Sequence, residues 1–252
     1  MFHARPRQSF KSRVALPSQT LPEKKLRAFE QRHVVVPKHA RYAILGSFDS
    51  QLSEVWIVCH GHGQLATRFL SRFLPLERAD RLFIAPEALS RYYLAPPVRG
   101  PHAPDTPVGA SWMTSEDRER EIEDYVSYLD LLHDEIFSAV DRSKIRLWVL
   151  GFSQGTATVA RWVARGKVQP NRVVLWSGLL PSELDSRTAG KLAQHSPLTI
   201  VLGSKDEFAR PDLVAVQAAR LNELMVPNRI IRFDGGHEIT PEVLALLTSE
   251  EW

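Results

Sequence analysis

The spacing of apolar residues alternates between two periods from residue 54 to the end of the chain. Short runs of apolar and β-branched residues are typical of buried strands, and they occur at 54–59, 81–86, 144–150, 172–176, 198–202 and 229–233. Helical spacing of apolar residues occurs between these runs, at 65–74, 116–140, 156–164 and 211–225, and a closing helix is expected from Thr240. This alternation predicts an α/β fold in which helices cover both faces of a mostly parallel sheet.

Two further elements are predicted outside this alternation. The runs 33–36 and 41–46 read as two strands joined by a tight turn, so an N-terminal antiparallel hairpin is expected at one edge of the sheet. The longest helix, 116–140, follows Ser115 as a candidate N-cap. Its expected core stripe consists of Ile122, Tyr125, Val126, Leu129, Leu132 and Ile136.

Composition divides the chain into an arm and a domain. Residues 1–30 are polar, basic and interrupted by prolines, so they predict a disordered or loosely packed arm, and 31–252 predicts one domain. The arm lacks the apolar core of a secretory signal, although its composition would also suit a transit peptide. Residues 87–115 show no periodicity and contain five prolines. A connection of that length indicates a functional loop that could cover a substrate.

Charge and cysteine content exclude several classes of protein. Residues 1–41 hold ten Lys or Arg and two Glu, a net charge of +8, so the remainder carries −5 within the total of +3. The domain therefore has no basic groove for nucleic acid. The sequence contains no run of eighteen apolar residues, so it predicts no membrane-spanning helix. The single cysteine, Cys59, lies in an apolar run and is expected to be a core residue in a reducing, cytoplasmic compartment, with a reactive thiol as the alternative.

The clearest chemical motif is Gly-x-Ser-x-Gly at residues 151–155, between a predicted strand and a predicted helix. A nucleophilic serine on such a turn needs small residues two positions before and after it, because neighbouring chain comes very close. Gly151 and Gly155 meet that need. The turn also places Ser153 at a helix start, where free N–H groups favour developing negative charge.

A nucleophilic serine needs a histidine base and an acid that orients it. His237 follows the last predicted strand, and Asp206 follows the strand before it. The chain order Ser153, Asp206, His237 is the order expected for a nucleophile on this kind of turn. Asp234 and Asp185 are the alternative acids.

Attack of a serine on an acyl carbon forms a tetrahedral intermediate, and the oxyanion of this intermediate needs two N–H donors. The backbone of Gln154, directly after the nucleophile, is expected to supply one, and the backbone of His62, in the Gly-rich loop after the strand 54–59, the other. Metal binding by His60 and His62 is the alternative for this loop. No third ligand stands at a suitable spacing, so neither a metal nor another cofactor is expected.

These motifs together resemble α/β-hydrolases of the phospholipase/carboxylesterase group, which includes acyl-protein thioesterases. The matching segments are 60–63, 151–155, 176–181, 203–206 and 235–237, with Ser111-Trp112 similar to a Trp-containing segment of that group. Three positions depart from the group's pattern: Gln64 replaces an acidic residue, Thr156 replaces Gly or Ala, and 207–211 replaces a Val-Pro pair after the acid.

The resemblance implies an enzyme that hydrolyses a small-molecule acyl ester through an acyl-enzyme. A thioesterase or lysophospholipase would use the same residues, and an inactive hydrolase-fold binding protein is the alternative from another class. The apolar residues of the long loop are candidates for an acyl pocket or lid, or for a cluster that packs this loop against the domain. They are Tyr92, Tyr93, Leu94, Trp112 and Met113. The sequence is compatible with either a monomer or a homodimer as the oligomeric state.

Overall fold

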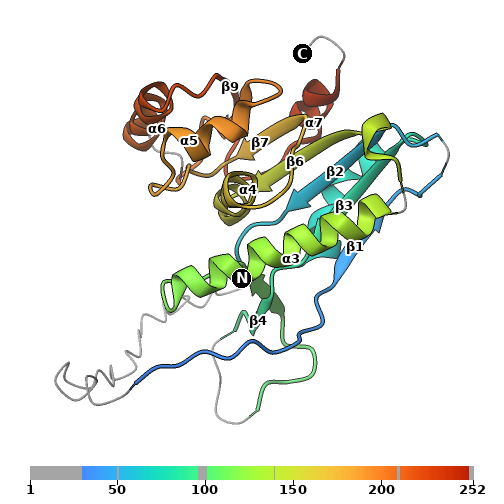
Figure 1. Cartoon of the computed structure of the whole chain (residues 1–252), viewed down its shortest axis with the longest axis vertical. Helices are drawn as coiled ribbons and strands as arrows, with labels where there is room; N and C mark the ends of the chain where they lie inside the picture. The colour runs from blue at the N-terminus through green and yellow to red at the C-terminus, as the bar shows by residue number, and fades with distance from the viewer. Residues whose placement is uncertain (1–29, 50, 96–100, 139, 209–210, 250–252) are drawn as a thin grey trace, which may run out of the picture. The chain divides into compact units, whose positions relative to one another are not determined.

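The computed structural model of the protein describes residues 30–49, 51–95, 101–138, 140–208 and 211–249 (Figure 1). The chain divides into two compact units, Met1–Lys38 and His39–Trp252. All of the predicted N-terminal arm except Glu30 lies outside the described residues. Within the described ranges, no helix is both long enough and apolar enough to span a membrane.

A seven-stranded sheet forms the centre of the second unit. Its spatial order is β1-β3-β2-β6-β7-β8-β9, and every neighbouring pair is parallel except β1 with β3. The strands are β1 (Tyr42–Leu45), β2 (Glu54–Cys59), β3 (Arg81–Pro86), β6 (Arg146–Phe152), β7 (Arg172–Trp176), β8 (Leu198–Gly203) and β9 (Asn228–Phe233). This sheet confirms the mostly parallel α/β architecture predicted from the alternation of strand and helix.

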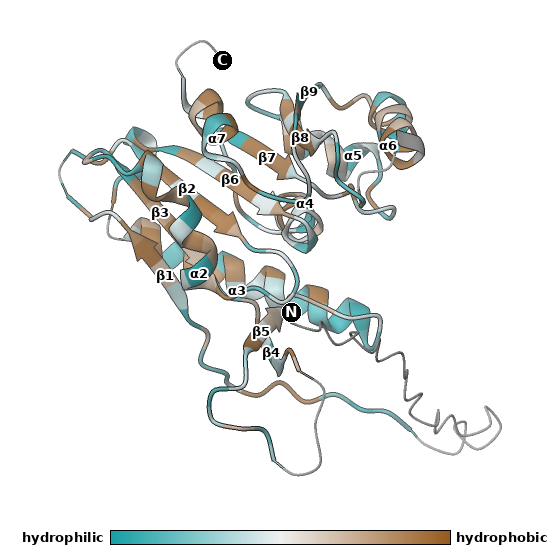
Figure 2. Cartoon of the chain, turned by 180° about the vertical axis from the view of Figure 1, so that it is seen from behind, coloured by the Kyte–Doolittle hydropathy of each residue, from teal (hydrophilic) through white to brown (hydrophobic). Residues whose placement is uncertain are grey.

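Helices cover both faces of the sheet. The α-helices are α2 (Ala66–Leu70), α3 (Arg118–Ser138), α4 (Gln154–Arg165), α5 (Ser186–Ala189), α6 (Pro211–Glu223) and α7 (Pro241–Thr248). Short 3-10 helices are η1 (Ser71–Leu76), η2 (Arg142–Lys144) and η3 (Gly190–Ala193). One face packs against α3, α4, α5 and α6, and the other against α2, η1 and α7, which lie toward the viewer in Figure 2.

Alternation along β2 shows why the sheet supports two cores. Val55, Ile57 and Cys59 point into the α3–α4 side, whereas Trp56 and Val58 point into the α2–α7 side. All five are fully buried, so the continuous apolar run contributes to both cores at once. Burial raises the pKa of the Cys59 thiol well above its ordinary value, which makes this cysteine an inert core residue.

Three expectations are corrected. Residues 33–36 form no strand and are exposed, so the predicted N-terminal hairpin is absent; only β1 forms, as an antiparallel edge strand beside β3. Three consecutive valines favour a strand only where one face finds an apolar surface. The loop 87–115 is partly regular, since β4 (Ser90–Tyr93) and β5 (Val108–Ser111) pair as an antiparallel hairpin. Helix α3 begins at Arg118, so Ser115 is not its N-cap.

The predicted stripe of α3 is confirmed, because all six of its residues are buried and pack in the α3–α4 core. Helix α5 was not predicted; it is a single turn with a reciprocal capping box between Asp185 and Thr188. Asp185 therefore caps a helix, which removes it as a rival acid for the catalytic site.

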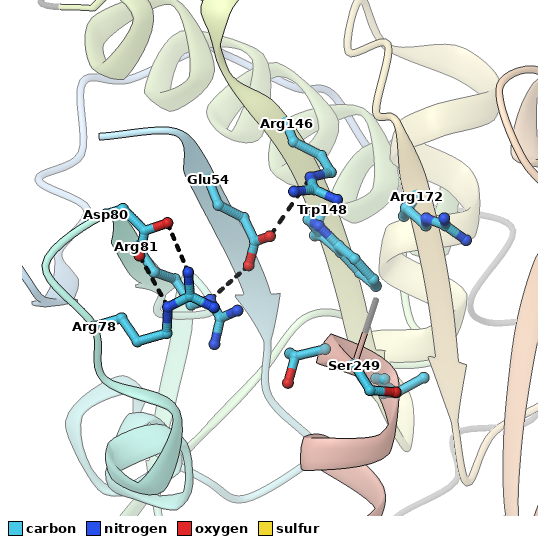
Figure 3. A pocket seen from close by; sticks show the side chains of 10 residues that line it. Glu54, Arg78, Asp80, Arg81, Arg146, Trp148, Arg172 and Ser249 are labelled. Carbon is cyan, nitrogen blue, oxygen red and sulfur yellow. Dashed lines mark hydrogen bonds and ion pairs between the residues drawn. The ribbon is translucent and has the colours of Figure 1, made fainter. Parts of the chain in front are cut away.

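A charged cluster joins the first residues of three central strands (Figure 3). The buried carboxylate of Glu54 on β2 accepts hydrogen bonds from Arg81 Nε on β3 at 2.5 Å and from Trp56 Nε1 at 2.6 Å. Its second oxygen lies 3.6 Å from Nε of Arg146 on β6. Arg81 is itself only 4% exposed, so the pairing with Glu54 compensates a buried positive charge.

Replacement of Glu54 by Gln is expected to destabilise the fold by about 3 kcal/mol, because it leaves the buried Arg81 without an anion. Urea denaturation of both proteins measures the difference. Glu123→Gln is the matched control: its pair with Arg120 is more than half exposed on both sides, so a loss below about 1 kcal/mol is expected. Equal losses in the two variants would contradict this account of the cluster.

Candidate active site

Ser153 lies on a strained turn between β6 and α4. Its backbone has φ 55° and ψ −117°, a conformation that a residue other than glycine rarely adopts. The flanking glycines are required sterically: a Cβ on Gly151 would lie 2.2 Å from the carbonyl oxygen of Gly155, and one on Gly155 would lie 2.2 Å from that of Cys59. The motif therefore has the close backbone crossing that its sequence pattern predicts.

The loops after β8 and β9 bring an acid and a base to this turn. Backbone pairing continues beyond the strands, with the N–H of Ser204 donating to Phe233 and that of Lys205 donating to Gly235. Asp206 and His237 follow directly, and His237 Nδ1 lies 3.0 and 3.1 Å from the two Asp206 carboxylate oxygens. The adjacent parallel strands thus place residues 31 positions apart in hydrogen-bond contact.

His237 also reaches the serine. Its Nε2 lies 2.9 Å from Ser153 Oγ, so one imidazole connects the hydroxyl to the carboxylate. The ring lies between Phe152 and Phe208, with centroid distances of 5.0 and 4.7 Å. With Nδ1 as donor to Asp206, Nε2 is the acceptor for the Ser153 hydroxyl, which is the arrangement that a general base requires.

The Asp206 side chain is fully buried, yet its carboxyl remains ionised. Burial alone would raise its pKa, but hydrogen bonds from His237 and from the backbone N–H of Phe208 outweigh burial, so the pKa lies below the ordinary value. The Ser177 hydroxyl also lowers this pKa. Its oxygen is buried and has no hydrogen bond of good geometry within the described residues, so its effect is smaller than those of the two well-formed bonds.

Two backbone N–H groups are available beside Ser153. The N–H of Gln154 is the first of α4, and that of His62 lies in the loop after β2; neither has a hydrogen-bond partner within the described ranges. The His62 loop passes directly against the serine, because a Cβ on Gly61 would lie 3.1 Å from Ser153 Cβ. These groups occupy the positions expected of oxyanion donors.

Two departures from the resembled pattern have local structural explanations. Gln64 Oε1 accepts the backbone N–H of Gly61 at 2.9 Å, which an acidic side chain could equally do. The Thr156 hydroxyl is fully buried but donates to the carbonyl oxygens of Gly151 and Trp176 at 3.0 and 3.2 Å. Both side chains are therefore accommodated without an unpaired polar atom at the turn.

A pocket of about 320 Å³ opens beside the serine and the histidine. Its lining is mainly apolar and consists of Ser153, Ser177, Gly178, Leu179, Leu202, Phe208 and His237. Sequence reasoning did not select Leu179, Leu202 or Phe208 as site residues. Each of them lies in or next to a strand-end motif identified in the sequence, and this position could have indicated them. The acyl pocket was instead predicted in the longer loop 87–115.

The five residues selected from that loop have different surroundings, and none lines this pocket. Trp112 is 2% exposed and lies in the core, and Met113 packs against the same core. Tyr92 reaches the oxyanion loop, because its hydroxyl lies 2.5 Å from His62 Nε2. Tyr93 and Leu94 are about half exposed. The structure therefore gives Tyr92 a contact with the loop after β2, whereas Trp112 and Met113 have packing positions.

Metal binding in the loop after β2 has no geometric support. His60 is fully buried, its Nε2 accepts the backbone N–H of Ala88, and its Nδ1 lies 2.7 Å from the carbonyl oxygen of Gly61. Burial lowers the pKa of His60, which keeps the ring neutral with Nδ1 as donor. The described residues contain no group of three or more candidate ligands close enough to hold a metal ion.

No family model matches the chain, and no curated protein matches its sequence. Solved structures do match: acyl-protein thioesterase 2 from Zea mays has a TM-score of 0.60 and 19% identity over 83% of this chain and 96% of that one. A carboxylesterase from Mesorhizobium loti has a TM-score of 0.60 and 17% identity over 82% and 92%.

Esterase PE8 matches with a TM-score of 0.59 and 18% identity, over 83% of this chain and 96% of that chain. The chain has the α/β-hydrolase fold. Ser153, Asp206 and His237 lie at the carboxyl ends of β6, β8 and β9, the sheet edge where open α/β sheets bind ligands.

The backbone crossing at the serine turn predicts the behaviour of two glycine variants. Gly155→Ala is expected to cost at least about 3 kcal/mol in unfolding free energy, because its methyl group would overlap the Cys59 carbonyl. Gly190→Ala is the control: no atom lies within 4 Å of the added Cβ, so its stability should be unchanged or raised by up to about 1 kcal/mol. Thermal and urea denaturation measure both variants, and a tolerated Gly155→Ala would contradict the crossing.

Proposed function

We propose that this protein is a serine hydrolase that cleaves carboxylic esters through an acyl-enzyme intermediate, as the phospholipase/carboxylesterase group does. The supporting observation is the continuous hydrogen-bonded chain from Ser153 Oγ through His237 to the buried carboxylate of Asp206. The matches to esterases and to an acyl-protein thioesterase support a hydrolase of this kind through their common fold.

In the proposed reaction, Ser153 Oγ attacks the acyl carbon while His237 Nε2 accepts its proton. Asp206 holds the imidazole with Nδ1 as donor and stabilises the imidazolium that forms. The negative charge moves to the substrate's carbonyl oxygen, where the N–H groups of His62 and Gln154 would receive it. His237 then gives the proton to the leaving alcohol, and the ester bond breaks.

Water repeats the sequence on the acyl-enzyme. His237 takes a proton from water, the resulting hydroxide attacks the acyl carbon, and Ser153 leaves with its proton restored. The apolar pocket beside the serine, bounded by Leu179, Leu202 and Phe208, suits the acyl part of the substrate.

A thioester substrate is the second candidate. The same groups would act on it, and the matched acyl-protein thioesterase 2 from Zea mays has the same fold. An inactive binding protein with this fold is the alternative from another class. A fluorophosphonate probe distinguishes the enzyme from the binding protein: labelling at Ser153 supports the enzyme, and an unlabelled Ser153 in the folded protein opposes it.

Ser153→Ala is expected to lower p-nitrophenyl acetate and butyrate turnover by at least about a thousandfold while the protein stays folded, because the nucleophile is lost. Esterase assays with circular dichroism as the folding check measure this. Ser143→Ala provides the control, since Ser143 lies in the short helix η2, before β6, and its hydroxyl donates to the N-cap Asp141. Full activity in Ser153→Ala would refute the mechanism.

The choice of acid is tested separately. Asp206→Asn should lower kcat by about 10³–10⁴-fold, because an amide cannot stabilise the imidazolium or hold Nδ1 as a donor. Asp234→Asn is matched to it: Asp234 follows β9 but pairs with Lys205 at 2.8 Å, with its side chain 77% exposed, so nearly full activity is expected. Steady-state kinetics of both variants decide the assignment, and the opposite ranking would make Asp234 the acid.

A further inference from the structure

Both candidate oxyanion donors depend on one short segment of chain. The 109–113 segment comprises the last three residues of β5 and the two residues that follow it, and it contacts the loop after β2 on one side and the Gln154 side chain on the other. We propose that Trp112 in this segment is a positioning residue that fixes the spacing of the two oxyanion N–H groups. The inference rests on the proposed function.

The loop that carries the His62 N–H is held by contacts from outside it. Glycines flank His62 on both sides, and Gly63 has a φ of 74°, so the loop needs outside contacts to stay fixed. Before His62, Trp112 Nε1 donates to the carbonyl oxygen of His60 at 2.8 Å. After it, the Gly63 N–H donates to the carbonyl oxygen of Ala110 at 2.9 Å. The His62 N–H is thus held from both directions.

The Ala110 contact is a short antiparallel bridge. The Ala110 N–H donates in turn to the carbonyl oxygen of Gln64 at 3.2 Å. The approach is so close that a Cβ on Gly109 would lie 2.4 Å from the carbonyl oxygen of Gly63. Backbone hydrogen bonds in both directions therefore join the hairpin to the loop after β2, so a shift of one is expected to displace the other.

The side chain of Gln154, whose backbone supplies the other N–H, is held by the same segment. Its Oε1 accepts the backbone N–H of Trp112 at 3.0 Å, and its Nε2 donates to the carbonyl oxygen of Met113 at 2.8 Å. Ser111 Oγ accepts a further bond from Nε2 at 3.1 Å. These bonds fix the orientation of the amide and tie the first residue of α4 to the segment that holds the His62 loop.

Trp112 contacts both the loop that carries His62 and the Gln154 side chain. Its indole N–H binds the His60 carbonyl, and its backbone N–H binds Gln154. The ring is 2% exposed and lines no part of the pocket beside Ser153, so it acts through other residues and not on the substrate. Preorganised donors lose their effect when displaced by about 1 Å, which can cost about a hundredfold in rate.

The test compares two tryptophans. Trp112→Phe removes the indole N–H that binds His60 and keeps an aromatic ring at this position. Trp162→Phe is the matched control, because Trp162 is also fully buried and its Nε1 donates to Asp130 at 2.9 Å, between α4 and α3. Trp112→Phe should lower kcat by about 10–100-fold and change KM by less than about threefold, whereas Trp162→Phe should keep kcat within about twofold.

A trifluoromethyl ketone supplies the readout that a structural role would not change. Its adduct with Ser153 carries an oxyanion in the same position, so its inhibition constant for Trp112→Phe should rise by the factor by which kcat/KM falls. Equal kcat values for the two tryptophan variants, or a lower kcat/KM with unchanged inhibition, would overturn the proposal.

Gln154→Met provides a second variant if Trp112→Phe does not fold. It removes the side-chain bonds to the segment but retains the backbone N–H, so the same loss in kcat and the same rise in the inhibition constant are expected. Unchanged kcat in a folded Gln154→Met would overturn the proposal. The wild-type protein separates the two claims: a wild type that turns over no ester and forms no adduct refutes the proposed function, and this inference with it.

Discussion

The site depends on a steric constraint, the crossing of the β6–α4 turn over the end of β2. Gly151, Gly155 and the Cys59 carbonyl approach so closely that no Cβ fits at either glycine. This contact projects Ser153 from the sheet and forces its positive φ. The same contact brings the loop after β2 against the serine, so one crossing sets the position of Ser153 relative to the His62 N–H.

Strand order supplies the remaining geometry. Because β8 and β9 are adjacent and parallel, the loops that follow them leave the sheet side by side and place Asp206 against His237. Burial of the Asp206 carboxylate would favour its neutral form, but its hydrogen bonds keep it charged. The imidazole thus receives a fixed negative partner on one side and the Ser153 hydroxyl on the other, and the apolar pocket lies next to both.

The sequence was most informative where local pattern and topology agree. Continuous apolar runs predicted the parallel sheet, and motifs directly after strands predicted which residues share one edge, because parallel strands end together. The α3 stripe was predicted for a similar reason, since helical periodicity records the buried face directly.

Tertiary contacts decided the features that pattern did not reveal. The valines at 33–36 have high strand propensity but form no strand, and the β4–β5 hairpin forms in a segment without periodicity. Trp112 illustrates the same limit at the site. Its sequence context suggested either an acyl pocket or a cluster that packs the loop against the domain. The structure buries its ring and directs its N–H groups to the His60 carbonyl and to Gln154, contacts that no spacing rule could reveal.

The most direct test of the central claim is the mass of the protein when it is acid-quenched during p-nitrophenyl ester turnover. The account predicts an initial burst of about one p-nitrophenol per protein, a mass increase equal to one acyl group, and localisation of that group to Ser153 after proteolysis. Turnover without an adduct, or an acyl group on a different residue, would contradict it.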